Sequence, residues 1–297
     1  MIFYKMHGTG NDFVLIENLK GEDLNYSAFS KVFCSRHFGV GADGLIVLLP
    51  SKEADFRMRI FNSDGSEAEM CGNGIRCLAR HIYEKGYASN KKFKIETRAG
   101  LIAPECFAVN GKVEKVRVDM GKPRFGDLHP KAGEFLTIEA QNLGVKLKLD
   151  GNTKMVEGGT ISMGNPHFVV FKGKGDPWNL EEHGKQLSIH PEHPHQSNVE
   201  FVEILGPSQL RVKVWERGVG PTMACGTGAC ASAAAARILK GLPEKIEVEM
   251  PGGVIEVEWD GSGVIYMSGP ARYVFEGKVS PELLPDSLKL PLDKVPC

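Results

Sequence analysis

Two cysteines, Cys71 and Cys225, occupy matching positions in the sequence and are suited to acid–base chemistry. Each ends a polar, glycine-rich loop and is followed by GNG or GTG, after which apolar residues recur at helical spacing. A cysteine in the first turn of a helix lies among free backbone N–H groups at the positive end of the helix dipole, and both favour its thiolate. We therefore expect each thiol to ionise more readily than free cysteine, whose pKa is about 8.5.

Two such thiols, one from each half of the chain, predict the inversion of a stereocentre that lies next to a carboxylate. Helix N-terminal amides can bind the carboxylate while the thiols lie on opposite faces of the neighbouring carbon. One sulfur, as thiolate, takes a proton, and the other, as thiol, returns one to the opposite face. No metal or organic-cofactor motif is present to act as an electron sink, so the amides must stabilise the developing enolate.

The elements that must position the cysteines recur at a constant spacing. Cys225 lies 154 residues after Cys71 (225 − 71). The same offset superposes three further pairs of positions: Asn11 on Asn165, Asn62 on Glu216, and Gly44 on Asn198. Both cysteine segments are followed by a strand, a glycine turn, a strand, a second glycine turn and a third strand. The chain therefore reads as two copies of one domain, each contributing a cysteine.

We predict an α+β protein of two pseudo-symmetric domains, each a mixed, mostly antiparallel β-sheet wrapped around a central helix. The two helices that follow the cysteines are apolar over most of their surface, which is typical of helices buried on several sides. The predicted segments are an N-terminal domain at 1–122 with Cys71, completed by a strand near 271–277, a C-terminal domain at 123–270 with Cys225, and an extended tail at 278–297.

Local patterns predict where several elements begin and end. Apolar spacing indicates helices near residues 27–38 and 178–187. In the first cysteine helix we expect Asn73 to be the N-cap and Gly86 to follow the last turn. The segment 121–130 contains two prolines and two glycines, which indicates an interdomain linker.

Composition and charge exclude several classes of function. The chain has 297 residues, 42% of them hydrophobic and 25% charged, which is ordinary for a globular protein. Its formal net charge is −1 and it has no basic stripe, so nucleic-acid binding is not expected. No apolar run is long enough to span a membrane. Seven irregularly spaced cysteines do not form a secreted disulfide framework, so we expect a cytoplasmic location, or an organelle stroma if a transit peptide has been removed.

A series of motifs along the chain resembles the diaminopimelate epimerase family. The motifs, in order, are KMHGTGNDF, GADG, NSDGSEAEMCGNG, SMGNPH, NVEF, WERG and ACGTGACAS. They cover nearly the whole chain, and the two cysteine motifs are highly specific. The resemblance implies a cofactor-independent isomerase that interconverts L,L- and meso-2,6-diaminopimelate in lysine and cell-wall biosynthesis. A small-molecule substrate, a homodimer and the absence of any metal are expected with it.

The resemblance also assigns roles to individual residues. Cys71 and Cys225 are the two bases. The remaining assignments are backbone amides that hold the reacting carboxylate (Gly72, Asn73, Gly226, Thr227), side chains that hold the distant L-centre (Asn62, Asn165, Asn198, Arg217), and residues that line the site (Asn11, and Glu216 as partner to an ammonium group). His167, beside Asn165, is either a core histidine or a residue that supports the thiols from behind. Many family members carry glutamine where this chain has Gly44, which cannot supply that side-chain contact.

The sequence also allows other functions for the protein and for its cysteine and histidine side chains. A related racemase acting on proline or hydroxyproline would keep both cysteines, but it would not need the side chains that hold a second amino-acid head. A non-catalytic redox sensor or anion-binding protein would instead close a disulfide. Cys77 and Cys230 lie on the helices and are expected in the core, because zinc ligands are usually separated by about two to four residues in compact knuckles. The other cysteines, Cys34, Cys106 and Cys297, are expected to be structural, and the histidines His190, His193 and His195 to lie in a solvated loop rather than bind a metal.

Overall fold

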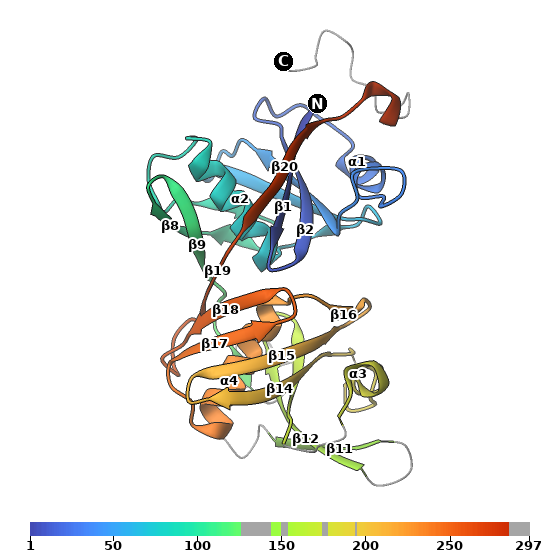
Figure 1. The fold of residues 1–297 in the computed structure, drawn as a ribbon, viewed down its shortest axis with the longest axis vertical. Coiled ribbons are helices and arrows are strands. Elements are labelled where there is room, and N and C mark those ends of the chain that lie inside the picture. The colour runs from blue at the N-terminus through green and yellow to red at the C-terminus, as the bar shows by residue number, and fades with distance from the viewer. Residues whose placement is uncertain (126–143, 150–153, 174–177, 194, 285–297) are drawn as a thin grey trace. The chain divides into compact units, whose positions relative to one another are not determined.

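The computed structural model describes residues 1–125, 144–149, 154–173, 178–193 and 195–284. The chain divides into two compact units, one comprising Met1–Val118 with Gly269–Cys297 and the other comprising Asp119–Ser268. Each unit combines a twisted, mostly antiparallel β-sheet with two α-helices (Figure 1). The predicted α+β class is confirmed.

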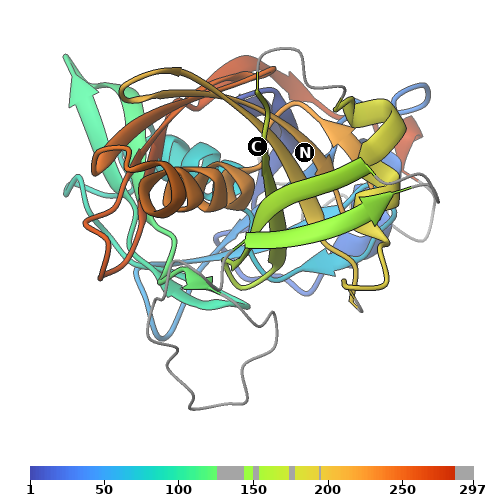
Figure 2. The same ribbon diagram turned by 90° about the horizontal axis from the view of Figure 1, so that it is seen from below.

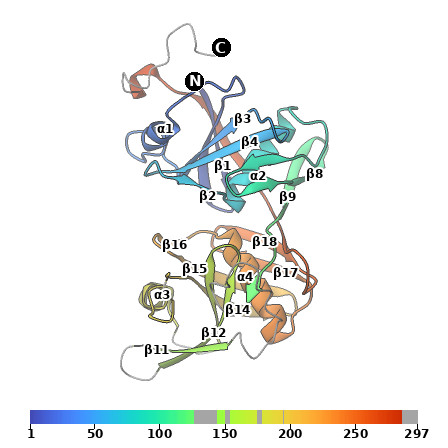
Figure 3. The ribbon, with the colours of Figure 1, turned by 180° about the vertical axis from the view of Figure 1, so that it is seen from behind.

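The sheet of the first unit runs in the order β20-β1-β2-β3-β4-β6-β7, and Figure 3 shows its strands β1 to β4 from behind. Its strands are β1 (Ile2–Gly8), β2 (Asn11–Glu17), β3 (Gly44–Leu49), β4 (Phe56–Asn62), β6 (Ile95–Thr97), β7 (Gly100–Ile102) and β20 (Arg272–Lys278), with β5 (Glu67–Ala68) paired to β4. A hairpin of β8 (Glu105–Val109) and β9 (Lys112–Asp119) follows β7. The helices are α1 (Tyr26–Phe33) and α2 (Gly72–Glu84), and α2 packs against β1 to β4 and β8.

The second unit repeats this plan. Its strands run from β10 (Arg124–Phe125) through β12 (Lys154–Ser162), β13 (Pro166–Phe171), β14 (Asn198–Gly206), β15 (Gln209–Glu216), β17 (Lys245–Met250) and β18 (Gly253–Glu258) to β19 (Tyr266–Gly269). At its margins β11 (Gly144–Leu149) pairs with β12, and β16 (Gly220–Thr222) pairs with β15. The helices are α3 (Leu180–Ser188) and α4 (Gly226–Lys240). Figure 2 shows α4 lying against the strands of this unit.

The two units match in strand register as well as in order. In each, an antiparallel pair is followed by a parallel, an antiparallel, a parallel and an antiparallel pair, with one helix in each parallel crossover. The matching cross-strand pairs are Phe13 with Gly44 and His167 with Asn198, then Leu45 with Phe61 and Val199 with Trp215. Because these pairs keep the 154-residue offset, the predicted pseudo-symmetry is confirmed at the level of single residues.

The two central helices are buried for different reasons. Helix α4 is rich in alanine, so strands can approach it closely on several sides. Helix α2 instead buries a guanidinium group, since Arg76 is fully buried and donates to Thr9 Oγ1 (3.0 Å) and to the carbonyl oxygen of Pro270 (3.3 Å). One turn later, Arg80 donates to the carbonyl oxygen of Ala271 (2.5 Å). These bonds tie α2 to the segment that enters β20.

Some predicted boundaries differ from those in the structure. Helix α1 ends at Phe33 rather than near residue 38, because the next residues form a turn in which the N–H groups of Val40 and Gly41 both donate to the Phe33 carbonyl. Asn73 lies inside α2 and is not its N-cap, which is Cys71. Gly86 follows the last turn as predicted, with φ at +74°.

Two predicted segments lie partly outside the described residues. Of the predicted linker 121–130, Arg124–Phe125 form β10, and 126–130 are not described. Of the predicted tail 278–297, Pro281–Leu283 form a 3₁₀ turn, and 285–297 are not described. Among the helices that the structure does describe, none is both long and apolar enough to cross a membrane.

Candidate active site

Cys71 is the N-cap of α2, and its side chain is partly accessible. Its Sγ donates to Asn11 Oδ1 (3.6 Å), which also accepts from Asn73 Nδ2 (3.2 Å). Asn11 is the first residue of β2, and it follows a tight turn in which Thr9 and Gly10 both adopt positive φ. The turn and the helix start therefore bring together three residues that the sequence predicted for one site.

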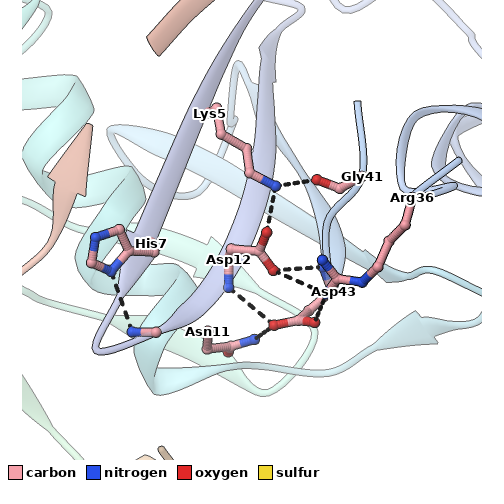
Figure 4. Close-up of polar contacts among 8 residues, drawn as sticks. Lys5, His7, Asn11, Asp12, Arg36, Gly41 and Asp43 are labelled. Carbon is pink, nitrogen blue, oxygen red and sulfur yellow. Dashed lines mark hydrogen bonds and ion pairs between the residues drawn. The ribbon is translucent and has the colours of Figure 1, made fainter. Parts of the chain in front are cut away.

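Asn11 is part of a network of charged and polar groups, drawn in Figure 4. Its Nδ2 donates to Asp43 Oδ2 (2.8 Å), and Asp43 Oδ1 accepts from Arg36 Nη2 (2.8 Å). Asp12 is bound by Lys5 on the neighbouring strand. Burial opposes ionisation of the Asp12 carboxyl, yet its pKa lies below the usual value because Lys5 donates to the carboxylate. The Asp12 carboxylate is therefore charged at neutral pH, and the bonds hold the members of the network in fixed positions.

Cys225 occupies the corresponding position at the start of α4 and is buried. Its Sγ accepts from the backbone N–H of Gly228 (3.4 Å) and lies 3.4 Å from Thr227 Oγ1. Asn165 Nδ2 donates to the same Thr227 hydroxyl (3.3 Å). Thus the structure links Cys225, Thr227 and Asn165 in one chain of contacts through the threonine hydroxyl.

The chain of contacts continues to a buried histidine and carboxylate. His167 Nε2 lies 3.0 Å from Asn165 Oδ1, and His167 Nδ1 lies 2.7 Å from Glu200 Oε1. The side chains of His167 and Glu200 are both fully buried. Within the described residues, Glu200 Oε2 has no hydrogen-bond partner. His167 thus contacts Asn165, which in turn contacts Thr227 beside Cys225, an arrangement consistent with the second of the two roles considered from the sequence.

Burial changes the expected ionisation of Cys225. Complete burial, followed by the nearby Glu216 and Glu200 carboxylates, raises the pKa of this thiol well above its ordinary value. The hydrogen bonds from Thr227 and Gly228 act in the opposite direction and are outweighed. The prediction that a helix N-terminus makes the thiolate easier to form is thus wrong for Cys225, because the chain pattern could not reveal the loss of water around the sulfur.

The cysteines Cys34, Cys77, Cys106 and Cys230, expected to be structural, are buried as Cys225 is, but none of the four begins α2 or α4. Burial raises the pKa of Cys34, of Cys77 and of Cys106 to about 12 in each case. Cys230 is fully buried on α4. Thiols of this kind are inert at neutral pH. This supports the expectation that they pack in the core, while Cys297 lies outside the described residues.

Gly228 is required for the close approach of α4 to Glu200. A Cβ at this position would lie 2.7 Å from Glu200 Oε1 and 3.4 Å from Cys225 Sγ. The first distance is shorter than any acceptable contact, and the carboxylate that it meets is held by His167. Gly228 therefore allows the Cys225 thiol, the start of α4 and the buried Glu200 carboxylate to pack closely together.

The remaining predicted binding residues fall into two local groups. In the second unit, Asn198 is buried, its Oδ1 accepts from the Arg217 backbone N–H (2.9 Å), and Arg217 Nη1 donates to the His195 carbonyl (3.0 Å). Glu216 Oε1 accepts from the Thr222 hydroxyl (2.6 Å). In the first unit, Asn62 is exposed at the end of β4, and its Nδ2 donates to Ser66 Oγ (2.9 Å).

Gly44 lies beside Asn62 and leaves no room for a side chain. The two residues are cross-strand partners on β3 and β4. A Cβ at Gly44 would lie 2.8 Å from the carbonyl oxygen of Phe61. The side-chain contact that glutamine supplies in many family members is therefore absent at this position.

The histidine loop is not uniformly solvated. His193 is 3% exposed and packs against the ring of Phe168, with ring centroids 5.0 Å apart. Burial, with the nearby His190 as a second cause, lowers the pKa of His193 to about 4. The solvated-loop prediction is thus wrong for His193, whose ring fills an apolar space. In the described part of the chain, no group of three or more His, Cys, Asp or Glu side chains is placed to hold a metal ion.

Sequence reasoning missed three functional groups: the Asp43 carboxylate, the Glu200 carboxylate and the Thr227 hydroxyl. Glu200 had a detectable signal, because an acidic residue stands inside the otherwise apolar run VEFV. Asp43 lies in the GADG motif, but a glycine-flanked aspartate is usually a turn residue. Thr227 was predicted only for its backbone amide, since its side-chain direction depends on the helix start.

Comparison with known proteins finds a family model that covers most of the chain. The family model described as "Diaminopimelate epimerase" matches residues 3–126 and 159–274. The chain is 47% identical over 282 residues to the diaminopimelate epimerase of Carboxydothermus hydrogenoformans and 46% identical over 289 residues to that of Desulforudis audaxviator, covering 94% of this chain and 99% of each relative.

Solved structures of more distant proteins share the fold. A Bacillus anthracis phenazine biosynthesis protein of the PhzF family matches with a TM-score of 0.67 and 19% identity, over 94% of this chain and 99% of that one. A probable proline racemase from Agrobacterium radiobacter matches with a TM-score of 0.65 and 17% identity, over 94% and 92%. The extent and identity of the sequence matches, rather than the shared fold, establish that the chain belongs to the diaminopimelate epimerase family.

Proposed function

We propose that this protein epimerises L,L-2,6-diaminopimelate to the meso form without a cofactor, in the synthesis of lysine and cell-wall precursors. The observation that carries the proposal is the pair of thiols at the N-caps of α2 and α4, in a chain of this family. Each compact unit acts as one functional domain and contributes one thiol. The same reaction runs in both directions, with the roles of the thiols exchanged.

The reaction is a proton transfer on each face of one carbon. Cys71, as thiolate, takes the α-proton, and the electron pair of the C–H bond moves into an enolate on the substrate carboxylate. Cys225, buried and with a raised pKa, is the thiol that returns a proton to the opposite face. At the end Cys71 is a thiol and Cys225 a thiolate, so proton exchange between the thiols and solvent resets the site.

The remaining residues bind the two ends of the substrate. The amides of Gly72, Asn73, Gly226 and Thr227 hold the reacting carboxylate and stabilise the charge of the enolate. The distant amino-acid head is held by four residues: Asn62, Asn165, Asn198 and Arg217. Asn11 lines the site, and Glu216 neutralises an ammonium group. The planar guanidinium of Arg217 suits a second carboxylate, which proline lacks.

Deuterium incorporation during the first turnovers tests the proposal. In heavy water, L,L-diaminopimelate is expected to give meso product that carries deuterium at the inverted carbon, while the remaining substrate stays unlabelled. This follows because a second base, equilibrated with solvent, supplies the returning proton. Product and residual substrate are analysed by mass spectrometry, with chelator-treated protein and proline as parallel samples.

Three outcomes would contradict the proposal. Efficient exchange into proline without exchange into diaminopimelate would favour the proline-type racemase. An oxidisable thiol pair without exchange into either compound would favour the redox or anion-binding protein. Loss of exchange after chelator treatment would count against cofactor independence.

We also propose a homodimer and a cytoplasmic location. Strand β20 forms one edge of its sheet, and it exposes Val274 (56%) and Phe275 (47%). Apolar side chains on an edge strand are usually covered by another surface. Sedimentation equilibrium is expected to give twice the chain mass, and a monomer at all concentrations would contradict the dimer.

The proposed cytoplasmic location rests on the free cysteines, which fit a reducing compartment. They are Cys34, Cys71, Cys77, Cys106, Cys225 and Cys230.

A further inference from the structure

The side-chain amide of Asn11 is bonded at both of its ends. Its Oδ1 accepts from Cys71 Sγ (3.6 Å) and from Asn73 Nδ2 (3.2 Å), and its Nδ2 donates to Asp43 Oδ2 (2.8 Å; Figure 4). The two ends of an amide have almost the same shape, so its partners decide which end faces which way. A carboxylate only accepts hydrogen bonds. The amide nitrogen must therefore face Asp43, which leaves the oxygen facing the sulfur.

The Asp43 carboxylate is itself held in place. Its Oδ2 also accepts from the Asp12 backbone N–H (3.1 Å), and its Oδ1 accepts from Arg36 Nη2 (2.8 Å). In return, the Asp43 backbone N–H donates to Asp12 Oδ1 (3.1 Å). Lys5 binds the other Asp12 oxygen and the carbonyl of Gly41. These reciprocal bonds between β2 and the start of β3 prevent the carboxylate from turning away from Asn11.

We propose that Asp43 is a positioning residue that fixes the Asn11 amide with its oxygen, and not its nitrogen, facing Cys71. The inference rests on the proposed role of Cys71 as a base. Asp43 acts through Asn11 and does not itself touch the reacting atoms.

The orientation of the amide affects the strength of the base. An amide N–H pointing at Cys71 would donate to the thiolate, stabilise it and make it a weaker base. An amide oxygen gives the thiolate no donor, and it accepts the S–H bond that forms when the sulfur takes up a proton. Because the α-proton of an amino acid is weakly acidic, the reaction benefits from a thiolate that keeps its basicity.

Three variants separate this role from a structural one. Asp43→Ala removes the acceptor and frees the amide to rotate. Asp43→Asn removes the charge but keeps an oxygen that can accept from Asn11, while the exposed Arg36 turns to water. Asp55→Asn is the matched control, because the Asp55 carboxylate accepts from the Lys94 backbone N–H (2.7 Å) elsewhere in the same unit.

The first measurement is the rate at which iodoacetamide alkylates Cys71 at neutral pH without substrate, followed by peptide mapping. Asp43→Ala is expected to raise this rate several-fold, because the thiolate fraction grows faster than its nucleophilicity falls. The same variant is expected to lower kcat several-fold. Asp55→Asn should stay within about twofold of the parent protein in both measurements, because its carboxylate lies outside this network. Asp43→Asn should fall between Asp55→Asn and Asp43→Ala, because it keeps an oxygen that can accept from Asn11 but its amide can turn either way.

A double-mutant cycle with Asn11→Ala shows whether Asp43 acts through the amide. In the Asn11→Ala background, Asp43→Ala should change neither alkylation nor turnover any further. An unchanged alkylation rate in Asp43→Ala, or an equal change with and without Asn11, would overturn the inference. Alkylation does not depend on turnover, so this failure is distinct from failure of the proposed reaction, which the deuterium experiment reports.

Discussion

Replacing either Cys71 or Cys225 by alanine is expected to lower the rate of epimerisation by about 10²–10⁴-fold, the range typical of a lost acid–base group. Each thiol serves one face of the carbon, so removing one stops turnover in both directions. Both side chains lie at helix N-caps, where Cys71 makes no capping bond and Cys225 makes one to the Gly228 N–H, so alanine is expected to cost at most about 1 kcal/mol of helix stability. The measurement is the rate of interconversion with each isomer as the starting substrate.

The same two helices supply the controls. Cys77→Ala and Cys230→Ala remove buried thiols from α2 and α4 without touching the helix starts. They are expected to retain turnover, with some loss of thermal stability from the small cavities that they leave. Near-normal rates in Cys71→Ala or Cys225→Ala would show that the reaction uses a single base. Inactive but folded control variants would show that activity depends on the core thiols.

Glu200→Gln is expected to lower turnover by about 10–100-fold, because hydrogen bonds to charged groups contribute roughly 1.5–3 kcal/mol. Glu200 Oε1 holds His167 Nδ1 at 2.7 Å, and His167 holds the Asn165 amide that contacts Thr227 beside Cys225. Glutamine keeps the shape but loses the charge. The glutamine oxygen can still accept from His167 Nδ1, but the bond is no longer charge-assisted and holds the imidazole less firmly. The measurement is kcat, together with the melting temperature of the variant.

A neighbouring carboxylate on the same strand provides the control. Glu203 is 54% exposed and pairs with Arg211 at 3.3 Å, so Glu203→Gln should leave both kcat and the melting temperature unchanged. In a His167→Ala background, Glu200→Gln should add no further loss. A loss of the same size in that background would show that Glu200 acts by a route other than His167.

The repeat in the sequence predicted the architecture well because one constant offset relates positions in the first half of the chain to positions in the second half. The offset that joins Asn11 to Asn165 also aligns the strand pairs, and the register of β2–β3 recurs in β13–β14. Amphipathic spacing was less reliable at helix ends. The turn after Phe33 is made by two N–H groups that share one carbonyl, which residue types alone do not reveal.

The sequence predicts which residues form the candidate site, but it could not predict the ionisation of Cys225. Sequence spacing indicates that Cys225 begins a helix, and the helix dipole then favours a thiolate. The structure adds burial and two carboxylates, Glu216 and Glu200, which raise the pKa of the thiol. The burial of Cys225 depends on strands that are distant in sequence. A local sequence pattern therefore could not show that burial outweighs the effect of the helix dipole on the pKa of this thiol. Asp43 was missed for the same reason, since its partner Asn11 lies on another strand.

The bonds from α2 to Pro270 and Ala271 bear on how the chain folds during synthesis. Strand β20 pairs with β1 along its length, and Arg76 and Arg80 are satisfied by carbonyl groups just before it. The first unit therefore cannot be completed until the ribosome has made nearly the whole chain. The second unit is continuous in sequence and can fold earlier. Until Pro270 and Ala271 have been added, Arg76 and Arg80 of the N-terminal segment lack these two hydrogen bonds and β1 lacks its pairing with β20.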